Sequence, residues 1–221
     1  MAYGAGPRIR NLALAATLLI GAPVLASAAP HILVALGDSL TQGYGLPPED
    51  GMVPQLQAWL LAHGADVTVI NAGVSGDTTA GGLARADWAL VPETDAVMVL
   101  LGGNDLLRGL PPEAARANLD AILAKTEARH LPTLLVPMTA PGNLGADYKK
   151  AFDAIFPDLA ARHGAVLADP YFTPLLARQG QTARLAAYMQ DDGLHPNKAG
   201  VALAIETLGP KVLELMARVK N

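Results

Sequence analysis

A run of five apolar residues at 32–36 ends at Gly37 and Asp38, and a single serine follows, in the sequence GDSL at residues 37–40. Serine is scarce in this chain, where it occurs only as Ser27, Ser39 and Ser75. A serine in a tight turn between a strand and a helix can act as a nucleophile, because its N–H and the positive end of the helix would stabilise an oxyanion. The alternative is that Asp38 or Ser39 only caps the helix.

A serine nucleophile requires a base, and His195 is the best candidate. It lies in QDDGLHPNKAG, outside any apolar pattern, with Asp192 three residues before it and Gly193 between them. At this spacing the carboxylate could bond one imidazole nitrogen and leave the other to face Ser39. The alternative is an exposed loop that leads into the last helix. The remaining histidines open a strand or end helices: His31, His63, His130 and His163.

Hydrogen-bond donors for an oxyanion occur in two glycine-containing segments between Ser39 and His195. Gly76 offers a backbone N–H that no side chain shields, and Asn104 offers a side-chain amide. Each segment is also typical of an ordinary turn. Together with the serine and the Asp-x-x-His pair, however, these donors favour acyl transfer to water.

The elements that must position these residues alternate between short apolar runs and amphipathic stretches. The apolar runs predict strands at 31–36, 67–73, 96–102, 133–138 and 165–170. The amphipathic stretches predict helices at about 50–63, 78–90, 112–129, 145–163 and 196–218. Because the apolar runs are continuous, we expect strands that are covered on both faces of a parallel sheet. The pattern therefore predicts one three-layer α/β/α domain.

The predicted sheet brings the polar segments to one edge. The first strand ends into Gly37 and Ser39, the second into NAGVSGDTT at 71–79, and the third into LGGNDLLRG at 101–109. In an open parallel sheet, ligands bind beyond the carboxyl ends of the strands. We therefore expect Ser39, Gly76 and Asn104 to lie at one site.

Four of these segments resemble the sequence blocks of the SGNH, or GDSL, hydrolase family. They are GDSL (37–40), VSGDTT (74–79), GGND (102–105) and DGLHP (192–196), and the resemblance covers essentially the whole chain after residue 28. The longer strings around them resemble the branch of that family with acyl-CoA thioesterase, lysophospholipase and arylesterase activity.

The resemblance implies a role for each matching residue. It implies Ser39 as nucleophile, His195 as base and Asp192 as the residue that orients the base. It also implies an oxyanion hole formed by the N–H groups of Ser39 and Gly76 and the side chain of Asn104. The implied fold is flavodoxin-like, with strand order 2-1-3-4-5, and the implied reaction needs no metal and no other cofactor.

Apolar residues in two long loops are candidates for an acyl-chain groove. They follow Asn104 and the fourth predicted strand, and the alternative is that they only cover the edge of the sheet. The predicted substrate-binding residues also include Asp38 beside the nucleophile and Thr78 near Gly76. The apolar candidates are Leu106, Leu107, Leu110, Met138 and Leu144.

Composition limits the classes of partner. The formal net charge is −4, without basic clusters, which argues against nucleic acid as a ligand. The chain has no cysteine, so disulfides, thiolate nucleophiles and thiolate metal sites are excluded. We expect a small-molecule acyl ester or thioester as the binding partner, and a monomer as the oligomeric state.

The first 28 residues have the pattern of a signal peptide. Arg8 and Arg10 precede an uncharged apolar stretch, and the small residues Ala26 and Ala28 form a small-x-small site for cleavage after Ala28. We predict a signal peptide at 1–28 and a hydrolase domain at 29–221, exported to the periplasm or secreted without a stable membrane anchor. The alternative is a retained anchor, although the apolar run is shorter than the ~20 residues that a membrane span needs.

Three other functions remain open from the sequence. A carbohydrate O-deacetylase could use the same fold, although Trp59 and Trp88 both lie in predicted helices and offer no evident platform for a sugar. A metal-dependent phosphoesterase could gather several carboxylates around His195. A non-catalytic acyl-binding module is the third. The carboxylates available to a metal site are Asp38, Asp77, Asp105, Asp191 and Asp192.

Overall fold

The apolar runs of the sequence form a parallel sheet at the centre of the molecule. The computed structural model describes residues 1–2, 4, 29–177 and 186–220. Within these ranges five strands pair in the order β2-β1-β3-β4-β5, and every pairing is parallel. The strands are β1 (His31–Gly37), β2 (Val67–Gly73), β3 (Ala96–Leu100), β4 (Thr133–Leu135) and β5 (Val166–Leu167).

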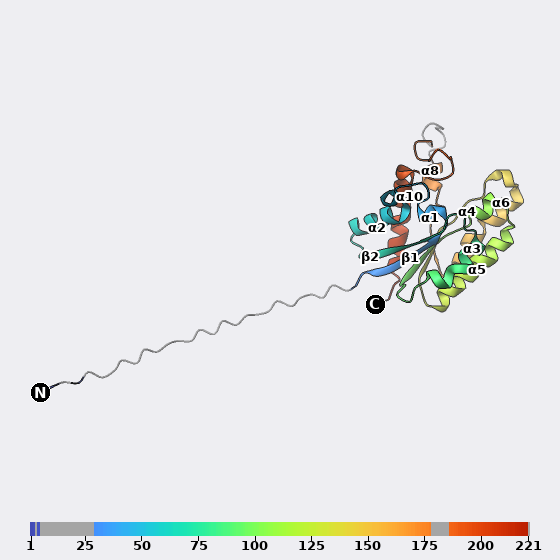
Figure 1. Ribbon diagram of the computed structural model, residues 1–221. Coiled ribbons are helices and arrows are strands. Elements are labelled where there is room, and N and C mark those ends of the chain that lie inside the picture. Colours follow the sequence, from blue (N-terminus) through green and yellow to red (C-terminus); the bar gives the residue numbers. More distant parts are fainter. Residues whose placement is uncertain (3, 5–28, 178–185, 221) are drawn as a thin grey trace.

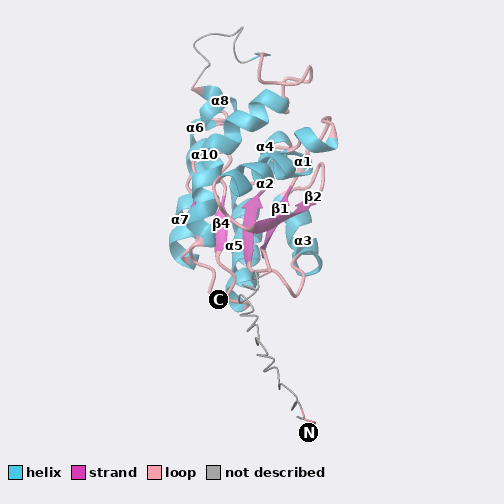
Figure 2. Ribbon diagram, turned by 90° about the vertical axis from the view of Figure 1, so that its left-hand side faces the viewer, coloured by secondary structure: helices cyan, strands magenta, loops and turns pink. Residues whose placement is uncertain are grey.

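Helices cover both faces of this sheet. On one side α2 (Met52–Ala62) packs against α10 (Lys198–Met216), and on the other α5 (Pro112–Ala128) packs against α3 (Thr79–Ala89) and α7 (Ile155–His163) (Figure 1). Figure 2 shows the strands, in magenta, viewed from the side of α2 and α10. The predicted three-layer α/β/α fold and its strand order are therefore confirmed. The shorter helices are α1 (Ser39–Gln42), η1 (Pro48–Asp50), α4 (Gly103–Leu107), η2 (Gly142–Leu144), α6 (Ala146–Asp153) and α8 (Thr173–Leu176).

The degree of burial depends on the position of a strand in the sheet. All five residues of β3 and the 33–36 segment of β1 are buried, as expected for strands covered on both faces. In β2, Thr68 and Asn71 are exposed. The prediction of complete cover was thus correct for the centre of the sheet and wrong for β2, because β2 lies at its edge.

The predicted helix at 145–163 is divided in two. α6 ends at Asp153 and α7 begins at Ile155, with Ala154 between them. Pro157 is the third residue of α7, and proline has no N–H with which to continue the hydrogen bonding of a preceding helix. Its ring also conflicts with the carbonyl four residues earlier, at Asp153, where α6 ends. The amphipathic pattern continues across this break, so periodicity alone predicts a single helix.

β4 and β5 are shorter than the apolar runs that contain them. The runs at 133–138 and 165–170 include Pro137 and Pro170, which cannot donate to a strand partner. Beyond the last paired residue of each strand, single backbone bonds continue the extended path. The N–H of Val136 donates to Val99 and the N–H of Ala168 donates to Leu135. The segments after β4 and β5 therefore still lead to the carboxyl edge of the sheet.

Both ends of the described domain lie at the amino edge of the sheet. β1 begins there at His31, and after α10 the side chain of Arg218 donates to the carbonyl of Gly164, two residues before β5. Figure 1 marks the C-terminus near the point where the chain enters β1. The predicted signal peptide lies outside the described residues, apart from positions 1, 2 and 4. No helix in the described part of the chain is long and apolar enough to cross a membrane.

Candidate active site

Ser39 is the first residue of α1, directly beyond the carboxyl end of β1. Asp38 is the N-cap of this helix, and its carboxylate accepts a hydrogen bond from the N–H of Leu40 at 3.0 Å. The capping role considered for this segment therefore falls to Asp38, and the Ser39 hydroxyl remains available for another partner. Ser75, the other serine in the described residues, donates its hydroxyl proton to the side chain of Gln42.

Ser39, His195 and Asp192 form one chain of hydrogen bonds. The distance from Ser39 Oγ to His195 Nε2 is 2.9 Å, and the distance from His195 Nδ1 to Asp192 Oδ2 is 2.6 Å. Ser39 and His195 are 156 residues apart in the sequence. This is the arrangement of nucleophile, base and orienting carboxylate that acyl transfer requires.

Asp192 is held as an anion by the loop that contains it. The backbone N–H and side chain of His195, together with the N–H of Leu194, lower the pKa of Asp192 to about 2. An ionised carboxylate accepts the Nδ1 proton of the imidazole and leaves Nε2 as the acceptor that faces Ser39. Gly193, between the two residues, has a φ of 65°, in the left-handed region that this tight turn requires.

Gln190 fastens the His195 loop to the segment that follows the nucleophile helix. Its backbone N–H donates to the carbonyl of His195 at 2.8 Å, and its side-chain amide donates to the carbonyls of Tyr44 and Pro196 at 2.9 and 3.0 Å. The ring of Tyr44 packs against the imidazole, with 4.8 Å between ring centroids. The sequence gives no sign of this contact, because Gln190 and Tyr44 are 146 positions apart and neither belongs to a recognised motif.

Gly76 and Asn104 lie at the ends of the neighbouring strands. Gly76 has a φ of 85°, and its carbonyl accepts a hydrogen bond from Arg108 Nη2 at 2.7 Å, which fixes the orientation of this turn. Asn104 is in the first turn of α4, and its amide donates to the carbonyl of Asp77 at 2.9 Å and more weakly to Asp38 at 3.4 Å. The two predicted oxyanion donors are thus linked through Asp77.

Burial changes the acid–base behaviour of Asp38. Desolvation raises the pKa of this side chain to about 6, although the N–H of Leu40 and the nearby His195 act in the opposite direction. The side chain is only 2% exposed. Asp38 therefore carries less negative charge near the site than an ordinary aspartate does at mildly acidic pH.

A cavity of about 330 Å³ opens beside Ser39. Ser39, Asn104 and His195 form its polar end, and apolar side chains form most of the remaining wall. Of the predicted substrate-binding residues, Leu110 and Thr78 are not among those that line it. Thr78 instead caps α3, where its side chain accepts from the N–H of Gly81. The predicted residues that do line the cavity are Asp38, Leu106, Leu107, Met138 and Leu144, and they are joined by Leu40, Pro141, Phe172 and Leu194.

A larger cavity, of about 560 Å³, lies at the opposite edge of the sheet. Its lining includes Asp95, Thr133 and His163, which are near the amino ends of strands or the end of α7. None of the residues predicted for catalysis borders it. The candidate active site is therefore the smaller cavity, beside Ser39.

Two of the carboxylates that a metal site could recruit, Asp77 and Asp105, have other partners. Asp77 pairs with Arg85 Nε at 2.6 Å, and Asp105 accepts from the N–H and hydroxyl of Thr79 at 2.8 and 2.7 Å. Among the residues that the structure describes, no group of three or more His, Asp or Glu could hold a metal ion. Neither tryptophan borders the cavity beside Ser39, so it has no evident sugar-stacking platform.

Comparisons with known proteins agree with this geometry. The model of the GDSL-like lipase/acylhydrolase family matches residues 35–203. The chain is 40% identical over 172 residues to an arylesterase from Vibrio mimicus, covering 77% of this chain and 82% of the relative. It is 37% identical over 174 residues to thioesterase 1/protease 1/lysophospholipase L1 from Escherichia coli K12, covering 78% of each.

A solved structure is similar across most of the chain. The psychrotrophic esterase EstA from Pseudoalteromonas sp., in a structure inhibited by monoethylphosphonate, aligns with a TM-score of 0.76 and 32% identity. The alignment covers 85% of this chain and 99% of that one. The family match, these relatives and the parallel sheet agree, and they confirm the resemblance found in the sequence. The chain belongs to the GDSL-like lipase/acylhydrolase family of carboxylic ester hydrolases.

Proposed function

We propose that this protein hydrolyses acyl esters and thioesters with Ser39 as the nucleophile, His195 as the base and Asp192 as the residue that orients the base. The observation that carries the proposal is the continuous hydrogen-bonded chain from Ser39 Oγ through the imidazole to the Asp192 carboxylate. Ser39, where this series of hydrogen bonds begins, lies in the wall of a largely apolar cavity that could hold an acyl group.

Acylation follows from the direction of these hydrogen bonds. His195 Nε2 takes the proton of the Ser39 hydroxyl as Oγ attacks the carbonyl carbon of the substrate. The resulting imidazolium is stabilised by Asp192, which stays ionised. When the tetrahedral intermediate collapses, His195 Nε2 gives the proton to the leaving alcohol or thiol, and the acyl group remains on Ser39.

Deacylation reverses the same roles. His195 takes a proton from water, which attacks the acyl-serine carbonyl, and then returns the proton to Ser39 Oγ as the acid leaves. Both steps use only this chain's own groups and water, so the proposed reaction requires no cofactor.

The N–H groups of Ser39 and Gly76 and the amide of Asn104 are the proposed donors to the oxyanion. Asn104 already gives one hydrogen to Asp77 at 2.9 Å, whereas its contact with Asp38 is long at 3.4 Å. The hydrogen in the longer contact is the one that a developing oxyanion would take, because a weak bond costs little to replace. Partial neutralisation of Asp38 reduces the repulsion that its carboxylate would exert on that charge.

We propose medium-chain acyl groups as the preferred substrates. The cavity beside Ser39 has about 330 Å³ and apolar walls formed by Leu106, Met138, Leu144 and Phe172. The names of the relatives, which include an arylesterase and a thioesterase 1/lysophospholipase L1, support activity on several leaving groups. A carbohydrate O-deacetylase of the same fold is the alternative, and a panel of nitrophenyl esters, acyl thioesters and acetylated sugars separates the two.

Replacement of Ser39 tests the mechanism, and Ser75 provides a matched control. We expect Ser39→Ala to lower kcat for a nitrophenyl ester by roughly 10⁴-fold or more with the melting temperature unchanged, as for other triad residues. Ser75→Ala should retain most of the activity. An organophosphonate should add one adduct per chain, and peptide mapping should locate it on Ser39.

Two results would contradict this proposal. An adduct on Ser75 would make the assignment of the nucleophile wrong. Loss of activity after exhaustive dialysis against a chelator, restored by zinc, manganese or magnesium, would instead favour the metal-dependent phosphoesterase.

We further propose that the enzyme is exported, and that it acts as a monomer on small-molecule acyl substrates without a stable membrane anchor or nucleic acid. The support is the pattern of the first 28 residues and the absence of basic clusters in the sequence. Intact mass of the exported protein and light scattering in solution test these two statements.

A further inference from the structure

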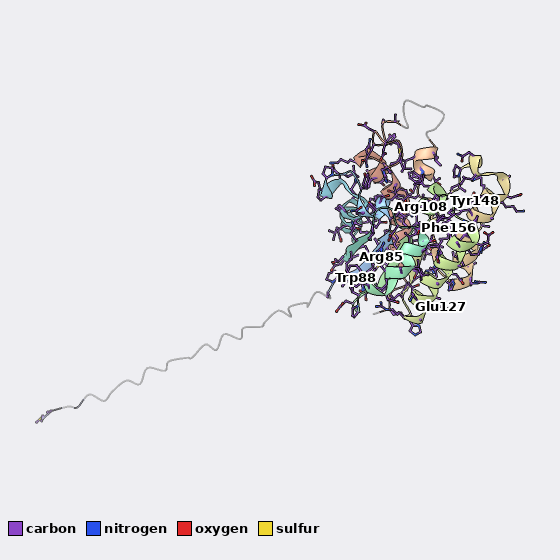
Figure 3. The ribbon with its side chains drawn as sticks, turned by 45° about the vertical axis from the view of Figure 1, so that its right-hand side comes forward. Arg85, Trp88, Arg108, Glu127, Tyr148 and Phe156 are labelled. Atoms are coloured by element: carbon purple, nitrogen blue, oxygen red, sulfur yellow. The ribbon has the colours of Figure 1, made fainter. Side chains whose placement is uncertain are left out.

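Arg85 joins three separate segments near the candidate site. It projects from α3, and its side chain is only 17% exposed. Its Nε donates to Asp77 Oδ2 at 2.6 Å, its Nη1 to the carbonyl of Ala72 at 2.8 Å, and its Nη2 to the carbonyl of Gly37 at 2.8 Å. Figure 3 labels Arg85 on the side of the molecule that α3 forms, with Arg108 above it and Trp88 below it in that view. The mechanism proposed above does not use this cation.

Two of the three acceptors, Gly37 and Asp77, lie within two residues of a proposed oxyanion donor. Gly37 ends β1 two residues before Ser39, whose N–H is one donor. Asp77 directly follows Gly76, whose N–H is the second. The carbonyl of Asp77 accepts the amide of Asn104, the third donor, at 2.9 Å. One guanidinium therefore holds the backbone next to the first two donors, and through Asp77 it holds the carbonyl that orients the third.

The local packing is built around this contact. Gly81 lies in the first turn of α3, and a Cβ atom there would approach Asp77 Oδ1 to 2.6 Å. The absence of a side chain at Gly81 leaves the space in which the Asp77 carboxylate folds over α3 toward Arg85. Lysine could not replace the arginine, because a single ammonium group cannot reproduce three donors in one rigid plane.

We infer that Arg85 is a positioning residue for the oxyanion hole, which it holds in place through Gly37, Ala72 and Asp77 without touching the substrate. This inference rests on the proposed function. It assigns to Arg85 an effect on the transition state, because the donors that it fixes meet negative charge only while the reaction proceeds. A residue that only stabilised the fold would affect the fraction of folded protein and not the turnover of each folded molecule.

The test compares Arg85→Lys with Arg129→Lys. Arg129 also donates to two backbone carbonyls, those of Leu90 and Val91, but these follow α3 on the way to the amino edge of the sheet. With a soluble nitrophenyl ester we expect Arg85→Lys to lower kcat per folded molecule by about 10- to 100-fold, with KM within about twofold, because displaced donors weaken transition-state binding. Arg129→Lys should lower the melting temperature to a similar degree and leave kcat unchanged.

A double-mutant cycle with Asn104→Ala provides a second measure. If Arg85 acts through the oxyanion hole, removal of the Asn104 amide should cost less in the Arg85→Lys background than in the wild type. Additive effects on kcat would overturn the inference, as would a wild-type kcat in folded Arg85→Lys.

The remaining outcomes are also decisive. Should Arg85→Lys not fold, Asp77→Asn removes the charge pairing at similar volume, and a wild-type kcat in that variant would contradict the positioning role. Should the wild type neither hydrolyse the ester nor form a phosphonate adduct at Ser39, the proposed function fails first, and the role of Arg85 fails with it. An active wild type with an unaffected Arg85→Lys refutes the positioning role alone.

Discussion

At the scale of single residues, Asn104 is the side chain with the most specific expected role. Its amide is oriented by the carbonyl of Asp77, and the hydrogen that faces Asp38 is only weakly engaged. An amide held this way can donate to an oxyanion without first reorganising, which is the main source of catalysis by such groups.

Substitutions of Asn104 should therefore affect turnover more than binding. We expect Asn104→Ala to lower kcat by about 10²–10³-fold with little change in KM, the usual cost of one lost oxyanion donor. Asn104→Asp should be at least as damaging, because it presents a negative charge to the oxyanion. Steady-state kinetics and melting temperatures on the same preparations check this. A variant that melts early but retains its kcat per folded molecule would show that Asn104 only shapes the turn.

Asp38 should make the stability of the fold depend on pH. Burial raises the pKa of Asp38 from its ordinary value to about 6, so the folded state prefers the protonated carboxyl. This contribution to the free energy of unfolding is fully present below about pH 4, is lost as the pH rises through 6, and is on the order of 3 kcal/mol. Asp38→Asn keeps a cap for α1 but cannot ionise. The free energy of unfolding of Asp38→Asn minus that of the wild type should rise by roughly 2–3 kcal/mol from about pH 4 to about pH 8.

Urea unfolding of both proteins at several pH values measures this difference. A difference that stays constant with pH would mean that Asp38 is not the group that titrates.

The sequence could predict the residues with chemistry in their side chains, but not those that act through contacts. Ser39, Asp192 and His195 were identified by residue type, by their spacing and by their place after apolar runs. Arg85 and Gln190 bond backbone carbonyls from other parts of the chain, and no local pattern records such a contact. Their importance depends on the folded arrangement, which brings together segments up to 146 positions apart.

At the scale of elements, α4 and η2 both contribute to the wall of the cavity beside Ser39. α4 contributes Leu106 and Leu107, and η2 contributes Leu144. The η2 segment follows β4 as a short 3-10 turn whose backbone makes few regular bonds. The length of acyl chain that the cavity accepts should therefore depend on the side chains at these positions more than on the sheet.

A larger side chain at Leu144 should shorten the preferred acyl chain. We expect Leu144→Trp to lower kcat/KM for a twelve-carbon nitrophenyl ester by roughly tenfold, comparable to the burial of about two CH₂ groups. The value for a four-carbon ester should stay within about twofold. Leu61→Trp, at an exposed position on α2, is the matched control. Equal effects on the two esters would show that the acyl chain lies elsewhere.

The limits of element prediction have identifiable causes. Alternation of apolar and amphipathic segments predicted every strand of the described sheet, because each apolar run is continuous and is separated from the next by a helical segment. The division at Ala154 was missed, since Pro157 lies inside an unbroken amphipathic pattern. The predicted strands at 96–102, 133–138 and 165–170 were also too long, since β3, β4 and β5 end at Leu100, Leu135 and Leu167 while the sequence stays apolar beyond the paired residues.

At the scale of the whole molecule, we expect the described domain to fold without the first 28 residues. β1 begins at His31, and the buried core begins at Leu33. A chain that starts at Ala29 should therefore have the same melting temperature, and the same kcat per molecule, as a longer form purified in parallel. Calorimetry and ester hydrolysis check this. A markedly lower melting temperature in the shorter chain would show that the leader contributes to the fold.

Both ends of the domain lie at the amino edge of the sheet, whereas Ser39 and its cavity open at the carboxyl edge. An enzyme with this arrangement can be immobilised through either end, with the opening of the cavity beside Ser39 directed away from the support. A tether or fused carrier added at residue 29 or after Lys220 should not obstruct access of the acyl substrate. Because the two ends and the cavity lie at opposite edges of the sheet, either end is suitable for attachment in surface display or for coupling to a second enzyme.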